Sequence, residues 1–309
     1  MEFNWKIRSI KDWRDFLDQS KNSNWMQTWS YAQASFAADY LKTRIALIEQ
    51  QSRPIGMMCV QEITFGPIQI INLKRGPLWF VTPTQELTVE FAKQFRNEFP
   101  KKLFQRLRWM PEIELQPESV DRLAKIGFKL RSENFITSLV DLNLPLTDIK
   151  KNLQQKWRNC LNKAEKSLIQ IEVQTTNKFL SSFLKFYQYH QHQRKYKGPS
   201  ARFLKTEFSH SEKTKDHFFV WAFIDNFPVA GIAVTRHGST AAYRVGWNNP
   251  DGRKYNAHYA LLWKAIEVSK EFGHAHFDLG GLLPEDAAGV THFKNGLNGQ
   301  EIKLAILSN

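Results

Sequence analysis

The stretch that decides the fold is Phe218-Phe-Val-Trp-Ala-Phe-Ile-Asp-Asn-Phe-Pro-Val-Ala-Gly-Ile-Ala-Val234. Its first apolar run predicts a buried strand, Asp225-Asn226 is a hairpin turn signal, and Pro228 opens a second strand. Further along the chain, the patterns predict a strand over 241–247, a helix over 257–272 and a strand over 274–279. This half of the chain therefore indicates the order strand, hairpin, strand, strand, helix, strand.

The first half of the chain shows nearly the same order. The patterns predict strands over 44–49, 54–60, 68–73 and 103–110 and a helix over 86–99. Repetition of a whole unit is a signal of topology, because one short match could arise by chance but an ordered series could not. We therefore expect an α+β (α/β) protein of two tandem domains, 1–144 and 145–309, each a mixed sheet flanked by helices. The last strand could pair back with the first domain.

Composition places the protein among globular chains. Its 309 residues are enough for two domains with real cores, and its hydrophobic fraction of 42%, with 23 Phe and 10 Trp, excludes a disordered chain. Cys59 and Cys160 are too few for a disulfide framework, the N-terminus has no signal-peptide pattern, and the apolar runs are too short to span a bilayer. These features predict a cytoplasmic protein without an integral membrane segment.

Positive charge is concentrated in one segment. The net charge is +13, and residues 150–215 contain 15 Lys and Arg against four Glu. Clustering of this kind indicates a polyanionic partner such as RNA, a nucleotide or an acidic membrane surface, whereas the alternative is a solvated basic face. A long helix is predicted over 149–168, because its apolar residues recur at three- and four-residue steps. The candidate RNA contacts on its polar side are Lys156, Arg158, Lys163 and Lys166.

A glycine pair marks the candidate reaction site. In His276-Phe-Asp-Leu-Gly-Gly281 a predicted strand ends at two glycines, where backbone or ligand must come close or the chain turns sharply. Phe293 and Lys294 follow in what we expect to be a Gly-flanked loop. A strand end, a bare backbone and a movable cation suit a polar acyl donor, whereas the alternative is a tight turn beside a solvated lysine. Asp278 could act as a base, although a carboxylate here more often binds backbone amides.

Other chemistry is disfavoured. His190 and His192, and likewise His274, His276 and Asp278, have same-face spacing on a strand, but no third cluster completes a metal site. No Ser-His-Asp or Cys-His arrangement is legible. We therefore expect neither a metal nor a resident cofactor.

The order of elements resembles the GCN5-related N-acetyltransferase (GNAT) fold. The resemblance implies that splayed central strands expose backbone groups to an acyl donor. In that fold a (Gln/Arg)-x-x-Gly-x-(Gly/Ala) loop opens the helix and binds the pyrophosphate of coenzyme A. Neither half has this loop, because Arg253-Lys-Tyr-Asn-Ala-His258 and Thr82-Pro-Thr-Gln85 stand in its place. Acetyl-CoA is therefore a disfavoured donor.

A more specific resemblance rests on motifs spread along the chain. They are Met26-Gln27-x-Trp29, Arg75-Gly-Pro77, Val140-Asp-Leu142, Lys156-Trp-Arg-Asn159 with Lys163-Ala164-x-Lys166, Arg194 followed by Tyr196, the Gly-Gly segment, and Phe293-Lys294. This set is similar to that of FemABX-type aminoacyl-tRNA-dependent aminoacyltransferases, the family that forms peptidoglycan bridges. The resemblance implies transfer of an amino acid from charged tRNA to a primary amine, typically on a peptidoglycan precursor.

The resemblance also implies roles for residues. Lys294 would stabilise the oxyanion of ester aminolysis, Phe293 would fix its segment by packing, and Asp278 completes the catalytic candidates. The candidate substrate-binding residues are Arg75, Arg194, Tyr196, Gln33, Trp29, Tyr259, Gly280 and Gly281. For Arg75 and Arg194 the competing interpretation is an ordinary surface ion pair.

Two departures keep the acceptor open. Gln33 stands where family members often have a lysine, and Met110 stands where they tend to have an acid. The expected partners are aminoacyl-tRNA and an amine acceptor, including a nucleotide- or lipid-linked muropeptide, with contact to a membrane surface left open. Two alternatives remain. One is an N-acyltransferase of this fold that uses an acyl-CoA or carrier thioester, and the other is a catalytically silent RNA- or nucleotide-binding protein.

Overall fold

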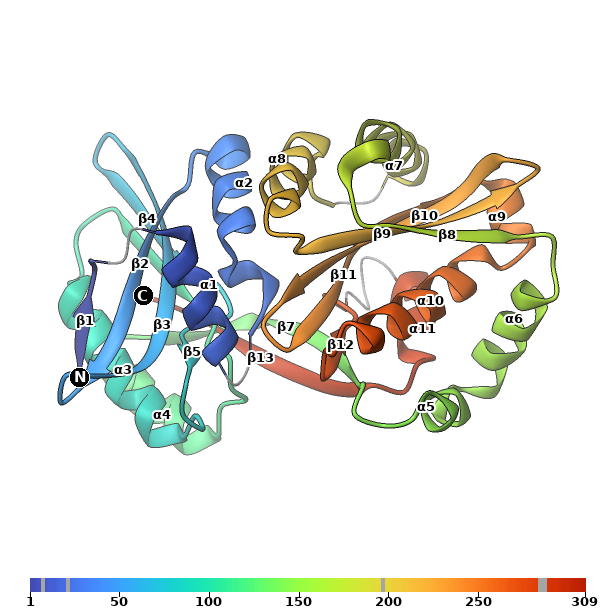
Figure 1. The fold of residues 1–309 in the computed structure, drawn as a ribbon. Coiled ribbons are helices and arrows are strands. Elements are labelled where there is room, and N and C mark those ends of the chain that lie inside the picture. The colour runs from blue at the N-terminus through green and yellow to red at the C-terminus, as the bar shows by residue number, and fades with distance from the viewer. Residues whose placement is uncertain (7–8, 21–22, 196–197, 283–287) are drawn as a thin grey trace. The chain divides into compact units, whose positions relative to one another are not determined.

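A computed structural model describes the whole chain except residues 7–8, 21–22, 196–197 and 283–287 (Figure 1). The chain divides into two compact units. Unit 1 comprises Met1–Phe135 together with Lys303–Asn309, and unit 2 comprises Ile136–Ile302.

Unit 1 contains a mixed sheet in the order β1-β2-β3-β4-β6-β13, with β5 beside β3. Strands β2, β3 and β4 are antiparallel, β4 and β6 are parallel, and the end of β13 pairs antiparallel with β6. The elements are β1 (Glu2–Asn4), α1 (Ile10–Gln19), η1 (Trp25–Gln27), α2 (Trp29–Asp39), β2 (Lys42–Gln50), β3 (Arg53–Phe65), β4 (Ile68–Leu73), β5 (Leu78–Trp79), α3 (Gln85–Glu98), β6 (Gln105–Trp109), α4 (Pro117–Lys125), the start of β7 (Lys129–Asp141), and β13 (Gln300–Ser308) from Lys303 on.

The core of unit 1 is aromatic. Helix α3 buries Phe91 and Phe95, four residues apart on one face, against Trp109 of β6 and Phe128. Ring centroids within this group lie 5.3 Å apart for Phe91 and Trp109 and for Trp109 and Phe128. Complete burial of each such ring contributes roughly 1.5–3 kcal/mol, so this packing holds α3 firmly on the sheet.

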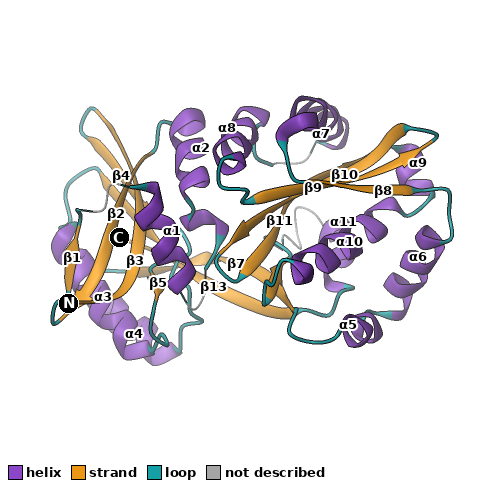
Figure 2. Cartoon of the chain, in the orientation of Figure 1, coloured by secondary structure: helices purple, strands orange, loops and turns teal. Residues whose placement is uncertain are grey.

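Unit 2 repeats the arrangement with the strand order β7-β12-β11-β10-β9-β8. Strands β8 to β11 are antiparallel, β11 and β12 are parallel, and β12 pairs antiparallel with the end of β7. The elements are α5 (Leu146–Asn152), α6 (Gln155–Glu165), β8 (Gln170–Gln174), η2 (Asn177–Phe179), α7 (Leu180–Arg194), α8 (Ala201–Glu212), β9 (His217–Ile224), β10 (Phe227–His237), β11 (Thr240–Asn248), α9 (Pro250–Lys254), α10 (Ala257–Glu271), β12 (His276–Asp278) and α11 (Ala288–Asn295). The predicted fold class, α/β with mixed strands flanked by helices, is confirmed, although the strands form one 13-stranded sheet where two were expected (Figure 2).

One long helix was predicted wrongly. Residues 149–168 form two helices, α5 and α6, because Leu153 and Gln154 adopt extended ψ values of 141° and 143°. The Gln154 amide donates 2.9 Å to the Gly296 carbonyl, a bond made across 142 residues that no local pattern reveals. The patterns also missed α1, α2, α4 and α8.

The parallel pair in unit 2 is short. Only Thr240–Ala242 of β11 face His276–Asp278 of β12. Beyond that point β11 continues to Asn248 beside β10, whereas the chain after Asp278 turns at Gly280, whose φ is +70°. The two strands therefore separate at Ala242 and Asp278, and this is the place where Lys294 lies.

Candidate functional site

Lys294 is a buried residue on helix α11. Its side chain is 6% exposed, its Nζ donates 2.9 Å to the Gly281 carbonyl, and Nζ lies 5.3 Å from the centroid of the Tyr243 ring. The sequence had predicted a movable cation in a Gly-flanked loop, and that expectation was wrong about the element. A helix holds the lysine because Phe293, its neighbour, packs into the core of unit 2.

Burial sets the charge of this lysine. Removal from water lowers the pKa of Lys294 to about 8, and the nearby Asp278 carboxylate offsets part of that effect. The side chain is therefore still mostly protonated at neutral pH, but it loses its proton in the mildly alkaline range. An ammonium held this way, poorly solvated and fixed in place, can stabilise developing negative charge strongly.

Asp278 fixes the glycine turn. Its Oδ1 accepts the Gly280 amide at 2.7 Å and the Thr137 hydroxyl at 2.5 Å, and the residue is 1% exposed. Gly280 needs to be glycine for two reasons, its positive φ and a Cβ position only 2.9 Å from the Tyr243 carbonyl oxygen. The turn in turn presents the Gly281 carbonyl that Lys294 contacts.

Phe293 and Tyr259 form one aromatic cluster with Trp157. The Phe293 ring lies 6.0 Å from Trp157 and 5.0 Å from Tyr259, measured between centroids, and the Trp157 indole donates 3.0 Å to the Phe293 carbonyl. These contacts tie α11 to α6 and α10. Burial, with Cys160 adding to it, raises the pKa of the Tyr259 phenol to about 12, so this hydroxyl stays neutral.

Tyr243, whose ring Lys294 contacts, and His258, whose ring lies 6.2 Å from that of Phe293, were not among the predicted site residues. The Tyr243 hydroxyl and His258 Nε2 lie 2.7 Å and 2.9 Å from the place that a Cβ on Gly246 would take, so both polar atoms lie against the bare backbone of β11. Burial lowers the pKa of His258 to about 4, so its ring is neutral at physiological pH. Asn248 Nδ2 lies 3.0 Å from His258 Nδ1, whereas Nε2 has no hydrogen-bond partner among the described residues.

The sequence did contain a signal for His258. His258 closes Arg253-Lys-Tyr-Asn-Ala-His258, the segment that stands where the GNAT pyrophosphate loop was expected. In the structure, the short helix α9 fills the connection from β11 to α10. Gly252 lies in α9 so close to β11 that a Cβ there would be 2.2 Å from Asn248 Oδ1. Gly252 therefore allows α9 to pack closely against β11.

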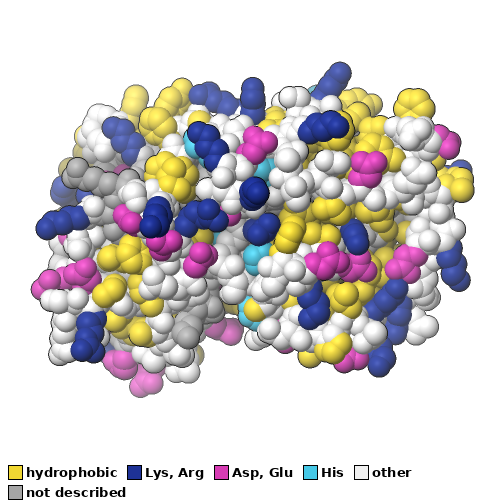
Figure 3. Space-filling model, viewed as in Figure 1, with side chains coloured by type: hydrophobic (Ala, Val, Ile, Leu, Met, Phe, Trp, Pro, Cys, Tyr) yellow, Lys and Arg dark blue, Asp and Glu magenta, His cyan; other side chains and the backbone are white. Residues whose placement is uncertain are grey.

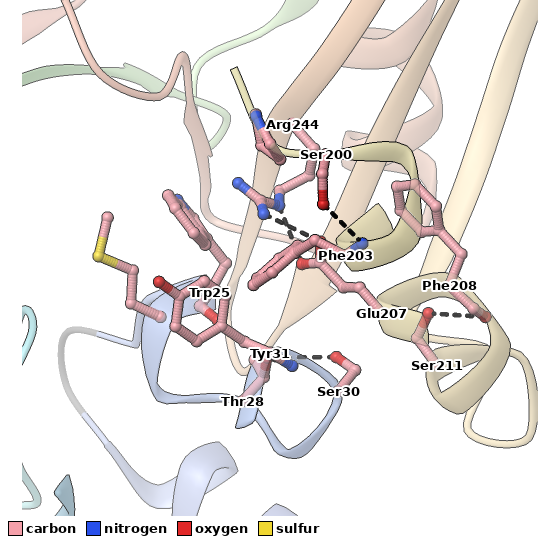
Figure 4. Close-up of polar contacts among 12 residues, drawn as sticks. Trp25, Thr28, Ser30, Tyr31, Ser200, Phe203, Glu207, Phe208, Ser211 and Arg244 are labelled. Atoms are coloured by element: carbon pink, nitrogen blue, oxygen red, sulfur yellow. Dashed lines mark hydrogen bonds and ion pairs between the residues drawn. The ribbon is translucent and has the colours of Figure 1, made fainter. Parts of the chain in front are cut away.

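On the opposite face of β11, Arg244 is held by Glu207. The register with β10 shifts by one residue at Arg244, a β-bulge, and Arg244 reaches helix α8 whereas Tyr243 packs against the core that contains α10. Its Nε and Nη2 reach the two Glu207 carboxylate oxygens at 3.0 and 2.9 Å, and both side chains are almost fully buried (Figure 4). Helix α8, which carries Glu207, starts at the Ser200 cap on the Phe203 amide, also drawn in Figure 4. This pair fixes the strand that carries Tyr243.

Three of the four predicted RNA contacts are exposed on α6. Lys156, Lys163 and Lys166 face solvent, because Trp157, Leu161 and Ala164 form the buried stripe of the helix. Arg158 is half-buried and donates 3.3 Å to the Leu153 carbonyl. Figure 3 shows Lys and Arg side chains, with acidic ones among them, over the part of the surface formed by α5 and α6.

The other predicted residues of unit 2 lie at one helix end or at the glycine turn. Arg194 is exposed at the last position of α7. Burial lowers the pKa of His190 on the preceding turn, and the charge of Arg194 adds to that effect. Tyr196 lies outside the described residues. Among the described residues, no group of three or more His, Cys, Asp or Glu side chains could hold a metal ion.

Arg75 in unit 1 is a buried structural cation. Its Nε and Nη2 lie 2.9 and 2.6 Å from the Glu112 carboxylate oxygens, its guanidinium stacks 5.4 Å over Phe135, and its side chain is 2% exposed. The competing interpretation, a surface ion pair, was therefore wrong about burial. Glu112 is 8% exposed.

The other predicted residues of unit 1 lie on α2. Trp29 packs edge-on against Trp13 at 5.3 Å, and Gln33 is half-buried one turn later. Gln27, from the same motif as Trp29, makes hydrogen bonds to β3 and to the residue that follows β4. Its side-chain oxygen accepts a hydrogen bond from the Cys59 backbone amide at 2.8 Å, and its side-chain nitrogen donates to the Lys74 carbonyl at 2.7 Å. Gln27 therefore connects β3 to the end of β4. Lys74 Nζ lies 3.1 Å from the Tyr31 hydroxyl of α2.

In the described part of the chain, no helix is both long and apolar enough to cross a membrane.

Comparison with known proteins supports the fold. Residues 150–295 match the model of the acetyltransferase (GNAT) domain. The crystal structure of FemX is similar, with a TM-score of 0.81 and 11% identity over 99% of this chain and 97% of that one. No curated protein matches the sequence.

Two other solved structures are similar over their whole length. One is the C-terminal domain of a putative lysylphosphatidylglycerol synthetase from Agrobacterium fabrum, with a TM-score of 0.60 and 12% identity over 97% of this chain and 91% of that one. The other is a tandem GNAT protein from the clavulanic acid biosynthesis pathway, with a TM-score of 0.55 and 10% identity over 100% and 98%. The chain therefore has a FemX-like fold of two GNAT-type domains, and unit 2 carries the matched domain.

Proposed function

We propose that the protein is an aminoacyltransferase that moves an amino acid from aminoacyl-tRNA to a primary amine of a peptide, with a peptidoglycan-precursor-like muropeptide as the expected acceptor. The observation that carries this proposal is Lys294, a buried ammonium placed on the Gly281 carbonyl where β11 and β12 separate. GNAT-type domains place the acyl donor between these strands. The similar fold of FemX and of a protein named as a lysylphosphatidylglycerol synthetase supports transfer of an aminoacyl group.

The chemistry needs positioning and charge stabilisation more than a strong nucleophile. The neutral acceptor amine attacks the ester carbonyl carbon, a C–N bond forms, and the bond between that carbon and the ribose oxygen breaks. The ribose oxygen leaves with the proton that the amine gives up. Negative charge develops on the carbonyl oxygen, and the Lys294 ammonium stabilises it. The neutral His258 ring and the Tyr243 hydroxyl offer hydrogen bonds to the same acyl group.

Two features support tRNA as the donor. Helix α9 and the closely packed Gly252 take the place of a glycine-rich pyrophosphate loop in unit 2. In unit 1 the Thr84 hydroxyl caps α3 by accepting the Leu87 amide, so that helix end is already occupied by its own side chain. The exposed lysines of α6 supply the positive charge that a nucleic acid needs.

The direct test is a transfer assay. The pure protein is incubated with total charged tRNA and an amine acceptor, and loss of each aminoacyl ester is followed. We expect one or a few esters to disappear only when the amine is present. Survival of all of them, with turnover of an acyl-CoA on the same amine, would establish the thioester alternative. Calorimetry should show acetyl-CoA binding no tighter than about millimolar.

The tRNA interface has its own test. The triple variant Lys156→Glu, Lys163→Glu, Lys166→Glu should weaken binding of any tRNA and flatten the dependence of log Kd on log salt by about 0.7–0.9 for each phosphate that the variant no longer neutralises. The matched control is Lys125→Glu with Lys129→Glu, two exposed lysines of unit 1. Unchanged binding in the triple variant together with no transfer from any tRNA would favour the catalytically silent alternative.

A further inference from the structure

We propose that one end of the unit 1 sheet is a docking surface for an anionic lipid membrane. The surface, here called the sheet-end patch, consists of large apolar side chains that belong to four different strands or their flanking turns. They are Tyr40, Phe65, Ile68, Leu103 and Phe104.

Strand register places these residues together. Lys42 at the start of β2 pairs with Glu62 near the end of β3, so Tyr40 lies at the same sheet end as Phe65. Phe65 pairs with Ile68 across the β3–β4 hairpin. Strand β6 runs parallel to β4 with Gln69 opposite Gln105, and the Gln69 amide donates 3.2 Å to the Phe104 carbonyl. The five residues therefore lie at one end of the strands of unit 1.

The exposure of these side chains is unusual. Phe65 and Leu103 are each 80% exposed, Tyr40 65%, Phe104 60% and Ile68 43%. Isolated exposed apolar residues need no explanation, but five gathered at one sheet end indicate a contact site. Figure 3 shows hydrophobic side chains projecting over the β3–β4 hairpin at the upper left.

The backbone holds one of the rings outward at a cost. Phe104 has a φ of +60°, a conformation that glycine or asparagine adopts far more readily than a bulky aromatic residue. A turn selected only for folding would have a small residue here. Strain of this kind persists where the side chain has a use, and here the use is an exposed phenyl ring.

The charges around the patch match an anionic surface. Lys42, Lys101, Lys102 and Arg106 are exposed beside it. The acids close to these residues in sequence or register include Asp39 and Glu98, which are exposed, and Glu62, whose carboxylate lies 2.8 Å from Arg44. Aromatic and aliphatic side chains flanked by lysines are the composition of an interfacial membrane contact, in which rings enter the headgroup region and ammonium groups meet phosphates.

A second copy of the chain fits this patch less well. The cores of protein interfaces are poor in lysine, and a symmetric pairing would place the exposed lysines of both copies in one interface. Lipid phosphates would instead neutralise them. A lipid surface offers both an apolar interior for the rings and phosphates for the lysines, so lipid is the better occupant.

The experiment is co-sedimentation of the full chain with vesicles of phosphatidylcholine alone and with 30% phosphatidylglycerol added. We expect binding to the anionic vesicles that weakens with salt. Phe65→Ser with Leu103→Ser should lower the partition coefficient more than tenfold, and Lys101→Gln with Lys102→Gln should lower it at least about tenfold on anionic vesicles only. The controls are Val81→Ser with Leu130→Ser and Lys125→Gln with Lys129→Gln, exposed residues of the same unit.

Three results would overturn the proposal. The first is no binding of the wild-type chain at any phosphatidylglycerol content. The second is an equal loss of binding in the control variants. The third is a concentration-dependent dimer, seen by sedimentation velocity, that the Phe65→Ser, Leu103→Ser variant abolishes while vesicle binding is absent. Melting temperature is measured for each variant, and since all the mutated side chains are exposed, it should stay that of the wild type.

Discussion

The two units each bury a cation near the end of their parallel strand pair, and they use it differently. In unit 1, Arg75 follows β4 and Glu112 follows β6, so the ends of the two parallel strands are joined by a bidentate ion pair. In unit 2, Lys294 comes from helix α11 and donates to the Gly281 carbonyl, while the Asp278 carboxylate binds the Gly280 amide and Thr137.

The difference is between a cation paired with a carboxylate and one that contacts only a carbonyl oxygen. A guanidinium in bidentate contact with a buried carboxylate is neutralised, and its planar fork is used up. An ammonium whose hydrogen bond goes to a carbonyl keeps its charge, and its desolvation is only partly compensated. Unit 1 therefore joins its strand ends by an ion pair, whereas unit 2 places there the cation that the proposed mechanism uses.

The largest expected effect is on stability when the ion pair of unit 1 is broken. Glu112→Gln should lower the free energy of unfolding by about 3–5 kcal/mol, because it leaves the Arg75 charge buried without its carboxylate. Denaturant titration measures this. The control is Glu86→Gln, which breaks the exposed pair with Arg122 and should leave the unfolding midpoint unchanged. If both variants unfold alike, Arg75 is not the structural cation described here.

The next largest effect is on catalysis in unit 2. Lys294→Met should lower turnover about 100- to 1000-fold, roughly 3–4 kcal/mol, because one charge that stabilises the oxyanion is removed. Lys205→Met, on the exposed face of α8, is the control and should keep full activity. In the wild type, turnover corrected for the neutral fraction of the acceptor should fall above pH 8, where Lys294 loses its proton. More than a tenth of wild-type activity in Lys294→Met would make this lysine a bystander.

Lys294→Met should also have a smaller, favourable effect on the free energy of unfolding. The pKa of Lys294 is about 8 in the folded protein against 10.5 when solvated, so between these values the unfolded chain binds more protons and wild-type stability rises with pH. Below pH 8 the charged, buried form is present and costs stability. Lys294→Met should therefore raise the free energy of unfolding at pH 7 by about 1–3 kcal/mol. The gain should shrink by pH 9.5, as measured by thermal melts at both values, and a destabilised variant at pH 7 would contradict it.

The smallest effect tests the glycine turn that presents the carbonyl to Lys294. Gly280→Ala should cost more stability than Gly273→Ala, since both have positive φ but only Gly280 meets a backbone atom within 3 Å of its Cβ position. Strain alone costs about 1 kcal/mol, which is the expectation for Gly273→Ala. Only Gly280→Ala should also lower turnover. Equal losses of stability and no loss of turnover would show that the turn has no part in placing the cation.

Much of the molecule could be predicted from local pattern. The fold class, the repeated order of elements and the strand over 68–73 followed from alternation, helical periodicity and turn residues, all of which act within a few positions. Gly280 was identified as a candidate because a glycine pair at a strand end is a local signal, and Lys294 was identified from the Phe293-Lys294 motif and the resemblance that it carries. The buried stripe of α6 likewise left its lysines exposed, as the three- and four-residue spacing requires.

Tertiary structure alone decided what those residues do. No spacing relates Arg75 to Glu112 or His258 to Tyr243, because such pairs form only when strands and helices pack. The break between α5 and α6 depends on a bond to Gly296, far along the chain. A sequence pattern assigns Lys294 to the polar surface. In the structure the neighbouring Phe293 is bonded to Trp157, Lys294 is buried, and burial lowers its pKa. Sequence determines which groups are present and the local backbone, whereas solvent exclusion, which sets their charge, is a property of the assembled core.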